Sequence, residues 1–308
     1  MPILFEKLSR FSLALKLAVV MSIVFAGSVV ARDKIVIAVS FAPYANMVQA
    51  IGGDEVEVVT LLPPGTDMRY YKPQPKEIKD FSTADIYLTD GSGVDRAWLP
   101  RFKQVKQTIK IVDISEGIVW LAGEGNEPNP YLWLSPKQMA KISTNIRVVL
   151  SKLRPERDSY FVAKHVFFLR KLNQVDDELE AAVRRLPKDA RTFIATRPLF
   201  TYLAQDYDLQ PQVVEVSGKV AKSKDVKKIV ELGRKTGAKM VFVPPQFDKL
   251  AVESFKRDFG AKVVEVNFLT YDFLDNAKSM ANVINEIAAA LRKDRPTLNL
   301  PKPKQLKK

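Results

Sequence analysis

The chain has 308 residues, of which 46% are hydrophobic and 27% charged, and this balance is typical of a globular protein rather than a disordered one. Its formal net charge is +13, and it contains no cysteine, which excludes disulfides, thiolate metal sites and cysteine nucleophiles. A chain of this length can bury one or two hydrophobic cores of ordinary size.

The first 31 residues form a basic start followed by an apolar run. Lys7 and Arg10 precede a long, mostly apolar stretch that is interrupted by Lys16 and ends at Ala31. This pattern predicts a secretory signal peptide over residues 1–31, cleaved near Ala31, and the alternative is an uncleaved membrane anchor. Because the chain has no cysteine to which a lipid could be attached, we expect an exported, soluble periplasmic protein that is not a lipoprotein.

Residues 32–135 predict an N-terminal α/β lobe. Short β-branched runs alternate with helical patterns, which is typical of a parallel sheet covered by helices. Strands are expected at 34–40, 56–62, 85–90 and 109–114, and helices at 43–51, 75–83 and 95–104.

Residues 136–186 show no strand pattern and predict a helical linker. The pattern is interrupted once, at Arg154 and Pro155, and a proline fits the first turn of a new helix. From there, apolar residues recur at helical spacing for about eight turns. The linker therefore contains a long, stiff backbone helix.

Residues 187–292 repeat the alternation and predict a C-terminal α/β lobe. Strands are expected at 192–196, 213–216, 239–244 and 262–266, and helices at 198–207, 222–236, 248–259 and 272–292. The remaining residues, 293–308, are rich in proline and lysine and predict a basic disordered tail. No nucleic-acid-binding motif accompanies it, so we expect no nucleic-acid partner.

The predicted fold is therefore α/β, with two lobes that each contain a four-stranded parallel sheet flanked by helices, joined by a long backbone helix. Open parallel sheets bind ligands beyond the carboxyl ends of their strands. Four residues that follow predicted strands are the candidate ligand-binding residues of a cleft between the lobes: Arg69, Tyr131, Arg197 and Asn267.

Several stretches resemble, in order and spacing, the zinc and manganese substrate-binding proteins of bacterial ABC importers. They read GTDMRYYKPQPKEIKDFSTADIYLTDGSGVDRAW, NPYLWLSP, ATRPLFTYLAQDYDLQ, VFVPPQF and GAKVVEVNFLTYD. The resemblance implies a monomeric periplasmic receptor, not an enzyme, that delivers its ligand to a membrane permease with a cytoplasmic ATPase.

The resemblance also implies metal ligands, and this sequence departs from them. Family members carry histidine at the positions of Arg69 and Tyr131. They carry histidine or glutamate at the position of Arg197 and a carboxylate at the position of Asn267. The only histidine, His165, lies on the predicted backbone helix among phenylalanines, where a core role is expected. The loop Ala122 to Pro130 is short and lacks the histidines found in many zinc-specific members.

Two arginines favour a different ligand. A guanidinium stays charged and has no lone pair to donate to a metal, whereas it binds carboxylate or phosphate groups through two parallel hydrogen bonds. We therefore expect no metal ligands, no cofactor, and a small anionic ligand or a metal wrapped in an anionic chelator.

Other interpretations stay open. The arginines could pair with Asp67, Glu215 or Asp272 and leave no ligand at all, so the protein would be a ligand-free scaffold or accessory protein. A metal could instead bind Asp67, Tyr131, Glu265 and Asp272. An enzyme is a further alternative, although no histidine lies near a serine and the GSG sequence at 91–93 is better explained as a turn.

Aromatic residues near the four positions have two interpretations. They could line a pocket for an organic ligand, or they could pack between the lobes, which we favour for Trp133 and Phe200. The residues concerned are Tyr70, Tyr71, Trp133, Phe200 and Phe268.

Overall fold

The structure is a computed structural model that describes residues 34–62, 66, 71–123, 127–214, 223–244, 247–267 and, with gaps, 272–289. Residues Ile35–Lys308 form one unit, and the other unit, Met1–Lys34, is described only at Lys34. The predicted signal peptide, Arg69 and the predicted tail lie outside the described residues. None of the helices that the structure describes is both long and apolar enough to cross a membrane.

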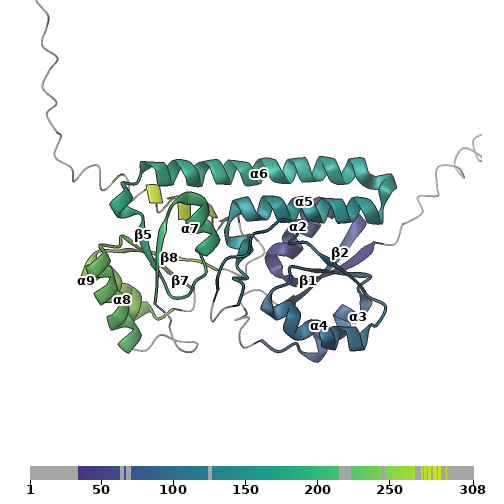
Figure 1. The fold of residues 1–308 in the computed structure, drawn as a ribbon, viewed down its shortest axis with the longest axis horizontal. Helices are drawn as coiled ribbons and strands as arrows, with labels where there is room; N and C mark the ends of the chain where they lie inside the picture. The colour runs from purple at the N-terminus through teal and green to yellow at the C-terminus, as the bar shows by residue number, and fades with distance from the viewer. Residues whose placement is uncertain are drawn as a thin grey trace, which may run out of the picture. The chain divides into compact units, whose positions relative to one another are not determined.

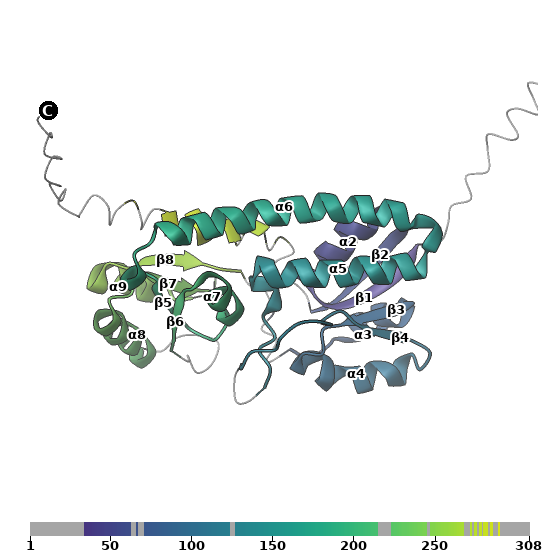
Figure 2. The ribbon, with the colours of Figure 1, turned by 45° about the horizontal axis from the view of Figure 1, so that its top comes forward.

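The first lobe is a four-stranded parallel sheet with the strand order β2-β1-β3-β4. Helices α2 and α5 (Pro136–Leu153) lie on the side of the sheet that faces α6 (Asp158–Arg185), and α3 and α4 lie on the other side (Figures 1 and 2). The elements are β1 (Ile35–Phe41), α2 (Ala42–Gly52), β2 (Val56–Leu62), α3 (Pro75–Thr83), β3 (Ile86–Thr89), α4 (Gly93–Val105) and β4 (Lys110–Asp113).

Local sequence explains these elements. The central strand β1 is apolar on both faces, and its residues 37–41 are buried, as expected when helices cover a parallel sheet on both sides. Helix α3 begins with a capping box, in which the backbone N–H of Gln74 donates to the Glu77 carboxylate at 2.7 Å. These elements confirm the sequence-based prediction for this sheet.

Two antiparallel helices follow the first sheet. Helix α5 (Pro136–Leu153) begins at its N-cap Ser135, a turn at Pro155–Arg157 reverses the chain, and α6 (Asp158–Arg185) runs back alongside α5 (Figure 1). Helix α6 packs against α5, against α2 of the first lobe and against α7 of the second. The predicted long backbone helix is therefore confirmed.

The second lobe is a parallel sheet with the same kind of topology, in the order β6-β5-β7-β8. Its elements are β5 (Thr192–Ala195), α7 (Thr201–Tyr207), β6 (Gln210–Val213), α8 (Ser223–Thr236), β7 (Met240–Val243), α9 (Lys249–Phe259) and β8 (Lys262–Glu265). Two 3-10 turns, Leu132–Leu134 and Lys188–Ala190, lie at the ends of the linker region.

Strand β6 lies earlier in the chain than the prediction at 213–216, although residues 215 and 216 are not described. Asp208 adopts a left-handed conformation, with φ of 55°, that ends α7, and Gln210 then pairs with Thr192 of β5. Pro211 lacks an N–H, which an edge strand tolerates. The β-branched run at 213–216 does not predict the start of this strand, because β6 pairs with β5 from Gln210 onward.

One continuous hydrophobic core joins the two lobes. It contains residues of both sheets together with the inner faces of α5 and α6, such as Ile146 and Leu172. A smaller core between the second sheet and helices α8 and α9 is built around Ile229 and Phe255. The two sheets are therefore held by shared packing as well as by the chain connection.

Candidate functional site

Tyr131 lies at the start of the 3-10 turn Leu132–Leu134 and is only 3% exposed. Its backbone N–H donates to the Asn129 side-chain oxygen at 2.9 Å, and its ring meets the Trp133 ring edge to face, with centroids 5.7 Å apart. Its position is thus fixed by both backbone and ring contacts.

The loop before Tyr131 folds back on itself. An antiparallel bridge joins Ala122 to Pro128, and the Gly123 N–H donates to Glu127 at 2.8 Å. A Cβ on Gly123 would lie 2.9 Å from the Asn129 Cα atom, so only glycine allows this close approach. These contacts therefore fix the backbone position of Asn129.

Arg197 lies in the loop between β5 and α7, and it is 7% exposed. The Leu199 N–H donates to the Arg197 carbonyl at 2.8 Å, and Pro198 restricts the backbone between them, so α7 begins at Thr201 rather than at the predicted 198. A guanidinium is thus buried at the carboxyl edge of the second sheet.

Hydrogen bonds bring the segments of Tyr131 and Arg197 together. The Asn129 side-chain N–H donates to the Pro198 carbonyl at 2.6 Å and to Thr201 Oγ1 at 2.9 Å. The structure thus joins two of the four predicted site residues across the lobes through one asparagine.

Helix α7 makes further contacts with the start of α5. The Asp206 carboxylate accepts hydrogen bonds from Ser135 Oγ and, at 3.0 Å, from Gln138 Nε2, and its carbonyl accepts from Lys137 Nζ at 3.3 Å. The Tyr207 hydroxyl donates to Asp176 of α6. These contacts hold α7 against both linker helices.

Asn267 follows β8 and is half-buried. Strand β7 lies between β8 and β5, so Asn267 shares the carboxyl edge of the sheet with Arg197 but belongs to a strand two places away. The fourth predicted residue, Arg69, lies outside the described residues.

Two of the alternative metal ligands, Glu265 and Asp272, lie in the described part of the second lobe. Glu265 is exposed at the end of β8, and the exposed Asp272 accepts a hydrogen bond from the Asp275 N–H at 3.4 Å. Asp67 and Glu215 are not described. In the part of the chain that the structure describes, no three His, Cys, Asp or Glu side chains gather closely enough to hold a metal ion.

His165 has the core position expected from the sequence. It lies on α6 on the side that packs against α5, and its Nε2 shares a hydrogen bond of 3.1 Å with Ser143 Oγ, so the expectation that no histidine lies near a serine is wrong. Burial, and to a smaller extent the charge of Arg147, lowers the pKa of His165 below its usual value.

Two buried carboxyl groups near the end of β3 were not predicted. The Asp95 carboxylate accepts hydrogen bonds from Ser40 Oγ, Tyr87 OH, Thr89 Oγ1 and, at 2.8 Å, the Asp90 N–H. Both carboxyl groups are buried. The GSG turn at 91–93 lies between the two aspartates and leads into α4. Aspartate is normally exposed, so residue type alone does not predict that these two carboxyl groups are buried.

Asp90 itself accepts hydrogen bonds from Tyr44 OH at 2.8 Å and the Ser92 N–H at 2.9 Å. Burial raises the pKa of Asp90 well above its ordinary value, and the negative charge of Asp95 raises it further. Asp90 therefore keeps its proton to a higher pH than an exposed aspartate does.

Two of the five candidate pocket aromatics, Trp133 and Phe200, are packing residues, but their ring contacts lie within one lobe each rather than between the lobes as expected. Trp133 contacts the rings of Phe41 and Tyr44 in the first lobe, whereas Phe200 contacts Phe193 and Phe242 in the second. Tyr71 is half-buried and donates to the Leu61 carbonyl at 2.6 Å, and burial raises its pKa to about 12. Tyr70 and Phe268 lie outside the described residues.

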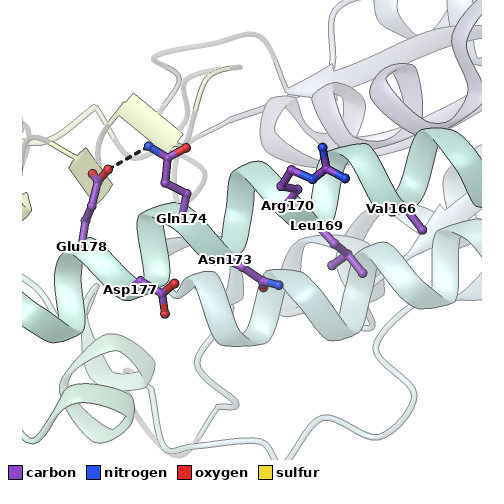
Figure 3. A pocket seen from close by; sticks show the side chains of 7 residues that line it. All are labelled: Val166, Leu169, Arg170, Asn173, Gln174, Asp177 and Glu178. Atoms are coloured by element: carbon purple, nitrogen blue, oxygen red, sulfur yellow. Dashed lines mark hydrogen bonds between the residues drawn. The ribbon is translucent and has the colours of Figure 1, made fainter.

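An open groove lies elsewhere, along residues 166–178 of α6. Figure 3 shows Arg170, Asp177 and Glu178 on this face, with Gln174 hydrogen-bonded to Glu178 at 3.0 Å. None of the predicted site residues lines it among the residues that the structure describes, so it is separate from the candidate site.

Comparison with known proteins gives a consistent result. The model of the family described as zinc-uptake complex component A, periplasmic, matches residues 37–293. A crystal structure of ZnuA has 30% sequence identity and a TM-score of 0.72, covering 83% of this chain and 99% of that chain. A periplasmic metal-binding protein from Candidatus Liberibacter asiaticus has the same fold, with a TM-score of 0.72, 20% identity, and coverage of 83% and 100% of the two chains.

Curated relatives agree with these matches. The metal ABC transporter substrate-binding lipoprotein FimA of Streptococcus parasanguinis is 22% identical over 74% of this chain and 78% of its own length. The manganese-binding lipoprotein MntA of Halalkalibacterium halodurans is 23% identical over 74% and 76%. Both are named lipoproteins, which differs from our expectation for this chain, whose 308 residues contain no cysteine.

Proposed function

The chain belongs to the periplasmic zinc-uptake component A family, the zinc and manganese substrate-binding proteins of ABC importers, and on this premise we propose a receptor whose metal site is replaced by an arginine-containing one. Proteins of this family bind substrates and are not enzymes. The proposed ligand is a small anion or a metal carried by an anionic chelator.

Arg197 carries this proposal. The residue is 7% exposed, in the loop that follows β5, and its guanidinium has no lone pair for a metal. At an effective dielectric of about 20, two unit charges roughly 4 Å apart interact by about 4 kcal/mol, so a bare dication beside this group is opposed by roughly twice that energy. A carboxylate or phosphate is attracted by the same charge and fits the donor geometry of the guanidinium.

Neutral groups complete the proposed site. Tyr131 and Asn267 offer a hydroxyl and an amide, which hydrogen-bond to anions and to neutral parts of a ligand. Arg69 is assigned to the site from its place in the sequence. As in the family, the protein would be exported through its N-terminal signal peptide to the periplasm and would deliver its ligand to a permease and ATPase.

Isothermal titration of residues 32–308 with four probes tests this function: citrate, zinc citrate, inorganic phosphate and sulfate. We expect at least one to bind with one-to-one stoichiometry. Arg197→Ala should weaken that binding by about 2–5 kcal/mol, the usual cost of truncating a buried partner of a charged group, and Arg197→Lys should recover only part of the loss.

Arg184→Ala is the matched control, because the Arg184 side chain is 73% exposed and pairs with Glu180 on the surface of α6. It should leave binding unchanged. Failure of all four probes to bind the wild-type protein, or equal losses in the Arg197 and Arg184 variants, would contradict the proposed anion site.

A further inference from the structure

We propose that Asn129 is a positioning residue that sets the geometry between Tyr131 and Arg197 across the two lobes. The inference rests on the proposed function, since it gives that ligand site a residue that touches no ligand but holds both sides of it.

The side chain of Asn129 is fully buried and uses both ends of its amide. Its oxygen accepts from the Tyr131 N–H at 2.9 Å, and its N–H group donates to the Pro198 carbonyl at 2.6 Å and to Thr201 Oγ1 at 2.9 Å. Pro198 is the residue next to Arg197. One planar group therefore contacts the backbone on each side of the candidate site.

The backbone of Asn129 is held as well. Its N–H donates to the Leu121 carbonyl at 2.8 Å, and its carbonyl accepts from Tyr202 OH at 3.0 Å. The same hydroxyl accepts from the Leu121 N–H at 3.2 Å. Because Tyr202 belongs to α7, the helix that follows the Arg197 loop, these bonds fix Asn129 against the second lobe independently of its side chain.

Only an asparagine or a similar amide can make this set of contacts. Aspartate keeps the oxygen that accepts from Tyr131, but when ionised it loses the donor and places a negative charge against the Pro198 carbonyl. When protonated it regains one O–H donor. Asn129→Asp therefore breaks the side-chain hydrogen bonds to the second lobe in a way that low pH reverses, while the backbone contacts of residue 129 remain.

The experiment compares Asn129→Asp with the wild-type protein between about pH 5 and pH 8. The probe is whichever of citrate, zinc citrate, phosphate and sulfate binds the wild-type protein most tightly, and affinities are expressed relative to wild type at the same pH. We expect a loss of about tenfold or more at pH 8, the size expected for an unpaired buried hydrogen-bonding group, and recovery toward wild type as pH falls.

Asn145→Asp is the matched control. The Asn145 amide donates to the carbonyls of Ile114 and Glu116, both at 2.9 Å, so it loses the same kind of bonds without contacting the second lobe. It should lower stability but leave affinity unchanged. Equal affinity losses in both variants, or a loss in Asn129→Asp that does not recover at low pH, would overturn the positioning role.

Amide hydrogen exchange of the ligand-free protein separates this inference from the proposed function. Asn129→Asp should accelerate exchange by about tenfold or more in residues 197–204, where the Leu199 and Ala204 N–H groups are hydrogen-bonded, and Asn145→Asp should not. If no probe binds the wild-type protein, the proposed function fails while this result still decides the role of Asn129. Unchanged exchange in 197–204 would refute it.

A second variant protects the test against misfolding. Thr201→Val removes one of the two acceptors of the Asn129 side chain while it keeps the size of the side chain. It should weaken binding of the probe by less than Asn129→Asp does. An unchanged affinity would count against the proposal.

Discussion

The Asp90 carboxyl group shows how burial changes the chemistry of a single residue. Its raised pKa means that the folded protein keeps a proton that the unfolded chain, with a pKa of about 3.9, has released. Between these two pKa values the folded state binds more protons, so the free energy of unfolding falls as pH rises. The contribution of Asp90 to stability therefore falls as pH rises and is smallest above its folded-state pKa.

Asp90→Asn tests this dependence, because the amide imitates the protonated acid and does not titrate. We expect the free energy of unfolding of the variant, measured by urea denaturation, to fall less than that of wild type between about pH 5 and pH 8. Asp189→Asn, a change at an exposed residue, is the control and should follow wild type. Parallel curves for the Asp90 variant and wild type would show that Asp90 does not hold the proton.

The residues of the candidate site could be predicted from the sequence only in part. Tyr131 and Arg197 were identified because they follow strands, and the structure joins their segments. Asn129 was missed, although an Asn-Pro pair is a recognised turn signal, because sequence does not show which backbone groups a buried amide will meet. Asp90 and Asp95 were missed for a similar reason, since their partners come from β1, α2 and β3.

At the level of secondary structure, α6 is the element that the sequence predicted most clearly. Its buried residues recur at spacings of three and four, and this pattern is visible in the sequence before the elements that pack against the helix are known. They are Phe161, His165, Phe168, Leu172, Val175, Leu179, Ala182 and Val183. Strand β6 and the start of α7 were less predictable, because pairing with β5 and the Arg197–Pro198 turn set their ends.

Leu172→Ala tests how much α6 contributes to the shared core. Leu172 is 1% exposed, and truncation should lower the free energy of unfolding by about 2–5 kcal/mol, from lost burial and the cavity left behind. Val166→Ala on the exposed face of the same helix should change it by less than about 0.5 kcal/mol. Similar effects of the two changes in urea denaturation would contradict the assignment of the buried face.

At the scale of residues 35–308, the two sheets share one core and a connecting helix. Helix α6 has 28 residues, which corresponds to about 42 Å, and it packs against helices of both lobes. The hydrogen bonds of Asn129 join the first lobe to Pro198 and to Thr201 of α7, and those of Asp206 and Tyr207 join α7 to the linker helices. A large hinge movement would have to break these contacts together.

Small-angle scattering with and without the tightest-binding probe tests this rigidity. We expect the radius of gyration to be the same within error in the two states, because the described connection between the lobes is helix α6 rather than the flexible strands of receptors that close by a hinge. Glu180→Ala, which changes a surface ion pair of α6, should behave like wild type. A large contraction with ligand would contradict the stiff connection.

The central claim is that arginine-containing chemistry replaces the family's metal site, and titration of residues 32–308 with zinc and manganese in competition with a chelator tests it most directly. We predict no one-to-one site tighter than about micromolar, which corresponds to roughly 8 kcal/mol of binding free energy. A one-to-one nanomolar site that Tyr131→Phe or Asn267→Ala abolishes would show that these residues bind a metal after all and would contradict the account.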